Sequence, residues 1–359
     1  MVLALVQPRP DVPDPLERAL AGALATLDDA PAALAPVTAA ARSVCERGGK
    51  RIRPRLCLLA YEAVARTPAT TAVHRFAAGV EILHAFMLVH DDIVDDARTR
   101  RGGPSVHAAI EGSLPASAPA RLATDLALLG GDLLFATAVQ TMSRSGVPAA
   151  RGRRAMQRVL DSATQAAQGE CLDVFHTVRG IGEIPSADLA EAIRLKTAEY
   201  SFVAPLVAGA MLGGATSPTL EALGFFGGRL GFAFQLADDL LDLFGDEART
   251  GKPVGGDVRQ RKRTVLVRTA YERACDADRE RLSSILDGAS VTDEDVAWVT
   301  ELVDRTGARA EVEDRVRRLV RAAMRALSRA AIDPAAAQAL RSLASDVVAS
   351  TANLVRRPS

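Results

Sequence analysis

The sequence has few of the features that mark several common classes of protein. Only 4% of its 359 residues are aromatic, only four are cysteines, and Lys plus Arg balance Asp plus Glu at 44 each. A chain of zero net charge has no overall field that would attract nucleic acid or an acidic membrane surface, so recognition of phosphate must be local. The scattered cysteines form no Cys-x-x-Cys pair, which is typical of reduced, mostly buried thiols in a cytoplasmic protein.

The first residues do not predict a signal peptide, and no stretch stands out as a predicted membrane span. These first residues have neither the basic start nor the apolar length of a signal peptide. The most apolar stretch, residues 202–215, is shorter than the roughly 20 residues that a span requires and contains Pro205. These absences predict a soluble, cytoplasmic protein with no membrane span and no nucleic-acid partner.

What the sequence has in abundance is apolar residues at helical spacing. Alanine and leucine dominate the 48% of hydrophobic residues, and alternating patterns are scarce, which predicts an all-α protein. Asp14, followed by a proline, supplies an N-cap for a first helix, and Thr292 and Asp333 mark later helix starts. We expect residues 1–13, which are interrupted by prolines, to be loose and residues 14–359 to form a single domain.

A dense acidic cluster follows an apolar, helix-like run at residues 90–102. Four carboxylates occupy six positions there, and in a helix Asp91/Asp95 and Asp92/Asp96 would each be i,i+4 pairs. Such like-charge pairs cost about 0.2–0.5 kcal/mol each, and a bound cation removes that cost. Carboxylate oxygens without nearby cysteine suit Mg²⁺. Taken alone, such a cluster is more often a solvated helix end.

The same pattern returns at residues 235–242, where another apolar helix ends in Asp-Asp-x-x-Asp. A cationic, glycine-containing loop follows each cluster: Arg100 and Arg101 follow the first, and Lys252 and Lys262 follow the second. We expect the two acidic helix ends to face each other across a cavity and to hold several Mg²⁺ ions.

A further basic segment, residues 48–54, places three cations directly before a helix that begins with proline. Helix N-termini favour anions, and Lys and Arg add charge-assisted hydrogen bonds to phosphate, although such a turn alone more often caps a neighbouring helix. Together with the metal ions, these segments would bind more than one diphosphate group. The apolar residues upstream of the acidic clusters would line a pocket, so the predicted substrate is an isoprenoid diphosphate.

On these segments, and over roughly residues 40–300, the sequence resembles the trans-isoprenyl diphosphate synthase (polyprenyl synthetase) family. The resemblance implies an all-helical bundle around a central cavity, usually a homodimer, in which Mg²⁺ bridges aspartates to an allylic diphosphate. It implies a prenyltransferase that condenses isopentenyl diphosphate with dimethylallyl, geranyl or farnesyl diphosphate through an allylic carbocation in a water-poor cavity. In the family, the released diphosphate is thought to take the final proton, so no protein base is implied.

The resemblance also implies roles for individual residues. The residues expected to bind isopentenyl diphosphate are Lys50, Arg53, His84 and Arg101. Those expected to bind the allylic substrate are Arg100, Lys196, Thr197, Gln235, Lys252 and Lys262. The expected metal ligands are Asp91, Asp95 and Asp238. The expected catalytic set is Asp91, Asp92, Asp95, Arg100, Lys196, Asp238 and Asp239.

Two positions depart from the family's pattern. Glu170 stands where the family usually has Gln, although Asp173, three residues later, is in place. Arg261 stands where the family usually has Gly before Lys262. The first departure leaves the role of Glu170 open, and the second is expected to alter the closing loop.

In the family, bulk just upstream of the first acidic cluster limits the length of the product. Phe86 lies five residues before Asp91 and Met87 lies four before it, so at 1.5 Å per residue both would be roughly 6–8 Å from the metals. We expect this ring to stop elongation at geranylgeranyl diphosphate (C20), with farnesyl or longer polyprenyl diphosphates as alternatives. In a further alternative, Phe86 only packs the core and another residue forms the floor.

Two functions of other classes remain as alternatives. A class I terpene cyclase shares the fold and the first cluster, but its second motif would have Ser or Thr and then Glu where Asp242 and Asp246 stand. A non-catalytic subunit of a heteromeric prenyl synthase would be expected to have lost part of one cluster, and both are complete here.

Overall fold

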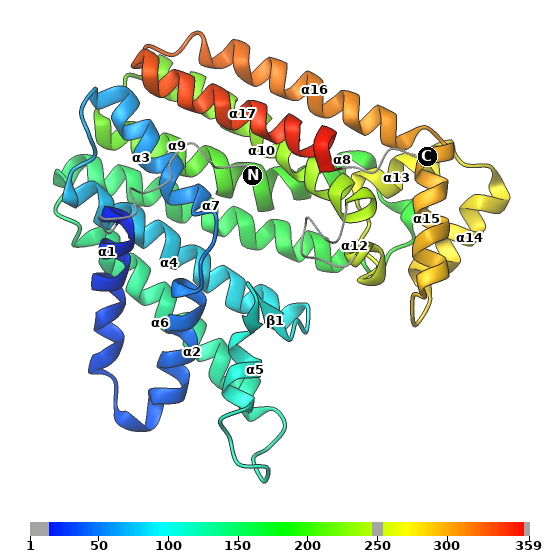
Figure 1. Cartoon of the computed structure of the whole chain (residues 1–359), viewed down its shortest axis with the longest axis horizontal. Helices are drawn as coiled ribbons and strands as arrows, with labels where there is room; N and C mark the ends of the chain where they lie inside the picture. Colours follow the sequence, from blue (N-terminus) through cyan, green and yellow to red (C-terminus); the bar gives the residue numbers. More distant parts are fainter. Residues whose placement is uncertain (1–13, 246–253, 355–359) are drawn as a thin grey trace. The chain divides into compact units, whose positions relative to one another are not determined.

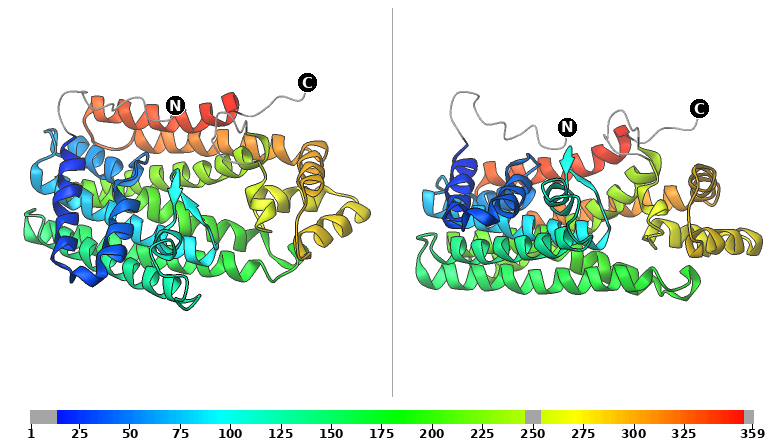
Figure 2. Two further views of the ribbon diagram at one scale, coloured as in Figure 1. Left: turned by 60° about the horizontal axis from the view of Figure 1, so that its bottom comes forward. Right: turned by 90° about the horizontal axis from the view of Figure 1, so that it is seen from below.

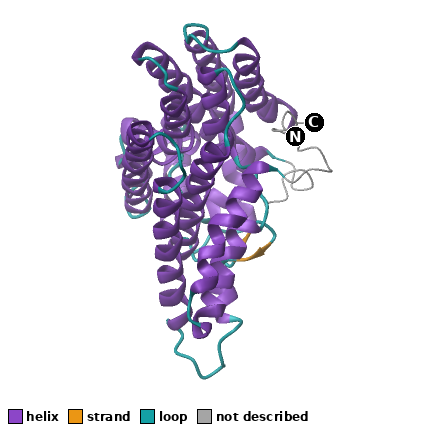
Figure 3. Ribbon diagram, turned by 90° about the vertical axis from the view of Figure 1, so that its left-hand side faces the viewer, coloured by secondary structure: helices purple, strands orange, loops and turns teal. Residues whose placement is uncertain are grey.

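The computed structural model describes residues 14–245 and 254–354. Almost all of this part of the chain is helical, which confirms the predicted all-α class (Figure 3). Two short strands in it, β1 (Thr99–Arg100) and β2 (Gly103–Pro104), pair as an antiparallel hairpin. The segment predicted to be loose, residues 1–13, lies outside the described residues.

Contacts between residues divide the chain into two compact units, and the boundary falls within helix α7 (Ala149–His176), after Arg158. The N-terminal unit contains the described chain up to Arg158, together with Ala208–Ala215. Before α7 its helices are α1 (Pro15–Leu24), η2 (Ala25–Asp29), η3 (Ala32–Leu34), α2 (Ala35–Glu46), α3 (Ile52–Ala65), α4 (Thr71–Val94), α5 (Val106–Glu111) and α6 (Leu122–Ser143). The single domain expected for residues 14–359 stays a prediction.

The C-terminal unit contains Val159–Val207 and the chain from Thr216 onward. Its helices after α7 begin with η4 (Ile181–Glu183), α8 (Ser186–Ile193), the π-helix η5 (Arg194–Val203), α9 (Ala204–Gly213, shared with the other unit) and α10 (Ser217–Phe244). The remaining helices are α12 (Gly256–Arg259), α13 (Val265–Arg273), α14 (Asp276–Asp287), α15 (Asp293–Arg305), α16 (Ala308–Leu327) and α17 (Pro334–Leu354).

Helix α4 is the central stem of the N-terminal unit. It packs against α1, α3 and α6, and Phe76, Ile82 and Leu83 are fully buried along it. Gly79 allows α6 to approach closely, because a Cβ atom there would lie 2.5 Å from Cγ of Met142. Helix α4 therefore holds the first acidic cluster at the end of a tightly packed helix.

Helix α10 has the same function in the C-terminal unit. Helices α16 and α17 lie side by side along it (Figures 1 and 2), and η5 packs on it as well. A Cβ atom at Gly231 would lie 2.6 Å from Cα of Ala198 in η5, so this glycine permits the close approach of the two helices. The approach brings the C-terminal half of α10 next to Lys196 and Thr197.

Three predicted helix starts are confirmed by their caps. Asp14 Oδ1 accepts a hydrogen bond of 2.9 Å from the amide of Leu16. Thr292 and Asp295 form a reciprocal capping box at the start of α15. Asp333 Oδ1 accepts a hydrogen bond of 2.9 Å from the amide of Ala335 in the first turn of α17.

Two described helices, α4 and α6, are long and apolar enough to cross a membrane by length and composition alone. They are not the stretch of residues 202–215 that stands out in the sequence. The apolar window of α4 is 61% buried inside the protein, as in the core helix of a soluble protein, whereas that of α6 is 39% buried. The expected absence of a membrane span stays a prediction.

All four cysteines lie in the described part of the chain and are free thiols. Burial raises the pKa of Cys45 and of Cys57 to about 12, so these two are inert. Cys171 and Cys275 are exposed, so the prediction of mostly buried thiols is correct for only half of them.

Candidate active site

The helix that carries the first acidic cluster ends earlier than the sequence suggests. Helix α4 stops at Val94, and Asp96 adopts a left-handed conformation with φ of 49°. The amide of Ala97 donates to the carbonyl of Asp92 at 2.8 Å, and the amide of Asp96 donates to Ile93, as in a Schellman motif. The predicted Asp92/Asp96 stack is therefore wrong, because Asp96 has left the helix, whereas Asp95 still bonds back to Asp91.

Within this cluster the two adjacent aspartates have different environments. Asp92 is fully buried, whereas Asp91 and Asp95 are half-buried. Arg100 Nε donates to Asp92 Oδ1 at 2.7 Å, and its Nη2 donates to Asp91 Oδ2 at 3.3 Å. Burial raises the pKa of Asp92 although Arg100 opposes the shift. Asp91 and Asp95 are thus partly accessible to solvent, and Asp92 anchors Arg100.

The β1–β2 hairpin positions the arginines that follow the cluster. Arg47 Nη1 donates to the carbonyl of Pro104 at 2.7 Å and to that of Arg100 at 3.4 Å. The Arg47 side chain lies directly over Gly103, where a Cβ atom would be 2.1 Å from Nη1. Arg47 therefore fixes the hairpin, a role that nothing in the local sequence indicates.

One of the three cations in residues 48–54, Arg51, is buried in the protein core. Arg51 is 4% exposed and donates to Glu81 at 2.8 Å and to Glu17 at 2.9 Å. Glu81 is itself buried, and its Oε1 lies 3.6 Å from Nη2 of Arg101. Lys50 is exposed and Arg53 is half-buried. A buried acid at an apolar helix position thus holds two arginines, and the sequence did not reveal this role of Glu81.

Three of the four residues expected to bind isopentenyl diphosphate, which are Arg53, His84 and Arg101, lie near one another in the N-terminal unit. Burial, followed by the charges of Arg53 and Arg101, lowers the pKa of His84 well below its ordinary value, so its imidazole is neutral at pH 7. Arg101 also lies over the glycine turn, 3.0 Å from the position that a Cβ atom of Gly49 would take. A cationic surface with a neutral histidine suits a diphosphate.

The C-terminal unit contains a cavity of about 150 Å³ that brings together most of the second group of predicted residues. It is lined by Asp173, His176, Leu189, Ala192, Ile193, Lys196, Thr197, Gln235, Asp238, Asp239, Asp257, Lys262, Arg263, Thr264 and Val265. Thus α7, η5, α10 and the loop before α13 each contribute polar side chains. Lys252, which was predicted with this group, lies outside the described residues.

The adjacent aspartates of the second cluster differ in burial, as those of the first do. Asp238 is exposed and Asp239 is 4% exposed. Gln235 Nε2 donates to Asp239 Oδ1 at 2.9 Å, and Thr197 Oγ1 donates to Gln235 Oε1 at 2.8 Å. Burial, and then Asp257, raises the pKa of Asp239 well above its ordinary value. Asp238 is therefore the accessible carboxylate, and Asp239 orders the wall of the cavity.

Lys196 lies in the π-helix η5, a helix form that is frequent at functional sites. Its Nζ is 2.5 Å from Glu170 Oε2 and 3.1 Å from Asp173 Oδ2. Glu170, whose role the sequence leaves open, therefore adds a second negative charge beside this ammonium group.

Asp257, which lines the cavity, and Asp242 repel each other. The amide of Asp257 donates to Asp242 Oδ2 at 3.0 Å. Burial, and then the charge of Asp257, nevertheless raises the pKa of Asp242 to about 7. No group of three His, Cys, Asp or Glu side chains in the described residues forms a complete cation site. Mg²⁺ needs only a few carboxylates when water and phosphate complete its shell, so the residues fit it.

This repulsion predicts a pH effect on the metal-free protein. Between about pH 4 and pH 7 the folded state keeps a proton on Asp242 that the unfolded state has released, so this group destabilises the fold as pH rises. We expect Asp242→Asn to be more stable than the wild type, and its advantage should be larger at pH 8 than at pH 5 by about 1 kcal/mol or more. Urea unfolding in EDTA measures this.

The matched control for this pH effect is Glu280→Gln at an exposed site on α14. It should show no such dependence on pH. An advantage of Asp242→Asn that is the same at both pH values would contradict the proposed repulsion. In the wild type, Mg²⁺ should raise stability more at pH 8 than at pH 5.

Phe86 and Met87 are half-buried on α4. The Phe86 ring lies 4.6 Å from the His90 ring and 5.2 Å from the Phe135 ring of α6, measured between centroids. Phe86 is thus held between its own helix and α6. Phe135 is a contact that the sequence did not predict.

The loop before α13 explains the second departure from the family's pattern. Arg261 has φ of 55°, a left-handed conformation that glycine adopts without strain. Its guanidinium donates to the carbonyl of Gly288 at 2.8 Å, which helps to hold the loop. The next residue, Lys262, enters the cavity, with its Nζ 3.8 Å from Asp257 Oδ1. The loop therefore still presents Lys262.

Comparisons with known proteins agree with this chemistry. The family model described as Polyprenyl synthetase matches residues 35–303. A short chain isoprenyl diphosphate synthase from Methanothermobacter thermautotrophicus is 39% identical over 261 residues, 73% of this chain and 74% of its own. A geranylfarnesyl diphosphate synthase from Natronomonas pharaonis is 32% identical over 253 residues, 67% of this chain and 70% of its own.

The structural comparison gives the same result. The crystal structure of geranylgeranyl pyrophosphate synthase from Corynebacterium glutamicum, complexed with isoprenyl diphosphate and magnesium, superimposes with a TM-score of 0.82 and 33% sequence identity. The match covers 93% of this chain and 96% of that chain. The fold is therefore that of the isoprenoid synthases, as predicted.

Proposed function

The chain belongs to the polyprenyl synthetase family and is a trans-prenyltransferase with a short-chain product, and we propose that this product is geranylgeranyl diphosphate. The enzyme would make it by condensing isopentenyl diphosphate with an allylic diphosphate. The family match confirms the resemblance inferred from the motifs. The observation that carries the proposal is the cavity shared by Lys196, Thr197, Gln235, Asp238 and Lys262.

The proposed roles follow from exposure and charge. Mg²⁺ held by Asp91, Asp95 and Asp238 would neutralise the departing diphosphate. Arg100, held by Asp92, and Lys196 add positive charge for the allylic diphosphate. With these we group the other proposed allylic contacts, which are Thr197, Gln235, Lys252 and Lys262.

The second substrate requires a separate cationic surface. We assign isopentenyl diphosphate to Lys50, Arg53, His84 and Arg101, because the arginines and the neutral histidine lie near one another. Its double bond then attacks the allylic cation. Two acidic clusters and two cationic groups favour a synthase over a cyclase, which needs one diphosphate site, and over a silent subunit.

The test is incubation of the purified protein with labelled isopentenyl diphosphate, Mg²⁺ and, in turn, dimethylallyl, geranyl and farnesyl diphosphate. Sizing of the dephosphorylated products should show a series that ends at C20. A C15 end or products of C30 and above would keep the reaction and refute the assigned length. Cyclic hydrocarbon from an allylic substrate alone, or no turnover, would refute the synthase.

The pair of carboxylates at Lys196 predicts an effect of Glu170→Gln on substrate binding. An incoming diphosphate must compete with Glu170 and Asp173 for the ammonium group, so removal of one charge should lower KM for the allylic substrate. We expect a fall of about three- to tenfold, given the partial exposure of the pair, with a smaller change in kcat. Steady-state kinetics measures both.

The matched control for Glu170→Gln is Glu191→Gln. It makes the same substitution at an exposed pair with Arg194, which does not line the cavity. This control should leave both Michaelis constants unchanged. An unchanged or raised allylic KM in Glu170→Gln would show that Glu170 does not restrain Lys196.

We also propose that the protein is a homodimer formed through α6. Leu128, Leu129, Leu133 and Phe135 are 38–56% exposed on this helix, which is unusual for four large apolar side chains on one element. We expect Leu129→Glu combined with Leu133→Glu to convert dimer to monomer in sedimentation velocity. Phe225→Glu, at an exposed aromatic on α10, should not. A monomeric wild type would contradict the proposal.

For the location of the enzyme we propose the cytoplasm. Support comes from α4, which is mostly buried within its unit and ends in the acidic cluster. Fractionation of cells into soluble and membrane extracts would test this proposal. Recovery of the enzyme in the membrane fraction would contradict it.

A further inference from the structure

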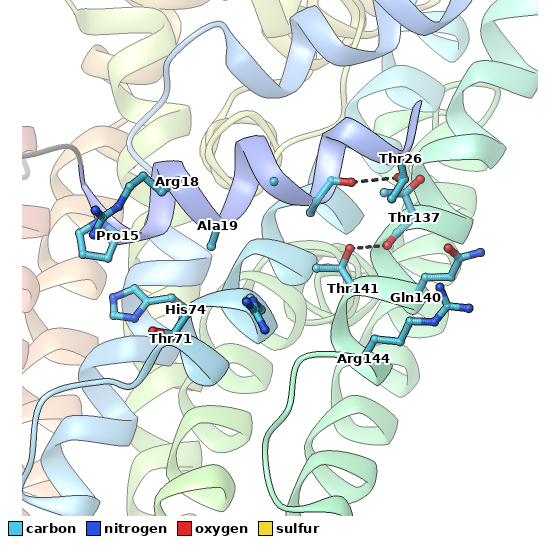
Figure 4. A pocket seen from close by; sticks show the side chains of 13 residues that line it. Pro15, Arg18, Ala19, Thr26, Thr71, His74, Thr137, Gln140, Thr141 and Arg144 are labelled. Atoms are coloured by element: carbon cyan, nitrogen blue, oxygen red, sulfur yellow. Dashed lines mark hydrogen bonds between the residues drawn. The ribbon is translucent and has the colours of Figure 1, made fainter. Parts of the chain in front are cut away.

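A cavity of the N-terminal unit lies away from the residues assigned to catalysis. It has a volume of about 710 Å³ and is formed by α1, the first turn of α4 and the last turns of α6. Figure 4 shows Arg18 and His74 towards one end of this groove and Gln140 and Arg144 towards the other. Arg75 on α4 is 16 residues before Asp91, which corresponds to about 24 Å along the helix.

The lining of the groove is positively charged. Its three arginines are Arg18 on α1, Arg75 on α4 and Arg144, the C-cap residue of α6, and the described lining contains no aspartate or glutamate. All three arginines are exposed, and within the described residues none is paired with a carboxylate. Many other arginines of the chain are paired, as Arg98 is with Glu111. Unpaired guanidinium groups that surround one cavity favour an anion with several charges.

The floor of the groove leaves room for such an anion. Ala19, Gly22 and Ala23 of α1 provide only small side chains, and a Cβ atom at Gly22 would meet nothing within 4 Å. The groove also includes Thr71 at the start of α4, where the helix dipole is positive. The amide of Val73 in this turn is already bonded to Thr70, so the arginines provide most of the attraction.

We propose that this groove is a second anion site, which binds a small molecule carrying a diphosphate or longer phosphate chain. The ligand would be held by Arg18, Arg75 and Arg144 over the small residues of α1. Because the site uses none of the residues assigned to the reaction, the inference goes beyond the proposed function and stands or falls independently of it.

The test measures binding of labelled inorganic diphosphate and, separately, of adenosine triphosphate to the full chain by equilibrium dialysis. EDTA removes divalent metal, and the stoichiometry is compared between the wild type and two variants. Arg75→Glu combined with Arg144→Glu reverses the charge, and Gly22→Phe fills the floor without changing the charge. Arg153→Glu, on α7 outside the groove, is the matched control.

We expect both groove variants to lose about one bound anion per chain, with the affinity of the site falling about tenfold or more and kcat unchanged. Binding of diphosphate identifies the free anion as sufficient, and binding of the nucleotide alone identifies a nucleotide site; both support the proposal. Equal stoichiometry in wild type and variants would overturn it. Dissociation of the protein into smaller species by the groove variants would also overturn it, since a second copy of the chain would then fill the groove.

Discussion

Asp91→Ala combined with Asp95→Ala should reduce turnover by about a thousandfold or more while leaving the helical content unchanged. The two side chains are partly exposed carboxylates of the first cluster, on α4 and at its C-cap, and we assign them to the metal. Loss of electrostatic stabilisation at a developing negative charge costs about 10²–10³ in kcat for a single hydrogen-bond donor, and loss of a metal site should cost more.

The fold should survive this substitution because the buried contact of the cluster remains. Arg100 would still donate to Asp92 Oδ1, and the Schellman motif that ends α4 depends on backbone groups. Removal of two repelling carboxylates at a helix C-terminus also relieves an unfavourable interaction with the helix dipole. Circular dichroism should therefore match the wild type without metal, and the temperature of thermal unfolding should be equal or slightly higher.

The same cluster offers a matched control. Asp96 is exposed and has left the helix, so Asp96→Asn removes one charge a few residues away from the assigned ligands. Asparagine tolerates the left-handed conformation, so the turn should be kept. We expect Asp96→Asn to retain activity within a few fold. Near-normal turnover in the double alanine variant would refute the metal assignment.

Motifs that resemble those of the family predicted residues that share a cavity. Lys196, Thr197, Gln235, Asp238 and Lys262 come from three segments of the sequence, yet all of them line one cavity. The helix starts at Asp14, Thr292 and Asp333 were predictable because a cap involves only its own neighbours. Short motifs can thus indicate which residues lie together, while the roles of these residues stay predictions.

The burial of individual charges could not be predicted in this way. Arg51 looks like a phosphate ligand in its basic turn, but Glu81, 30 residues away, holds it in the core. The sequence likewise does not distinguish the two adjacent aspartates of each cluster. In the structure only one of each pair is buried: Asp92, which accepts from Arg100, and Asp239, which accepts from Gln235. Which charged side chain is buried depends on contacts between distant segments, and the spacing of motifs does not specify these contacts.

Phe86→Ala should lengthen the main product from C20 to C25 and beyond. On α4, Phe86 lies five residues before Asp91, roughly 7–8 Å along the helix axis. Its ring is held between His90 and Phe135, so it cannot swing aside easily when the growing chain arrives. Removal of the ring leaves a space that one more isoprene unit can enter.

The contact with α6 gives this prediction a second variant. Because the Phe135 ring lies 5.2 Å from the Phe86 ring, Phe135→Ala removes the support of the ring and should lengthen part of the product. Met87→Ala, at a longer and more flexible side chain, should have a smaller effect. Phe225→Ala removes an exposed aromatic residue from α10 and should leave the product at C20.

Product sizing after incubation with farnesyl diphosphate and excess isopentenyl diphosphate measures all four variants. The ratio of C25 to C20 should be largest in Phe86→Ala and intermediate in Phe135→Ala. If Phe86→Ala lowers thermal stability and leaves the product at C20, the ring only packs the core and another side chain ends elongation. If Phe86→Ala and Phe135→Ala both lengthen the product, the contact between α4 and α6 is the element that limits chain length.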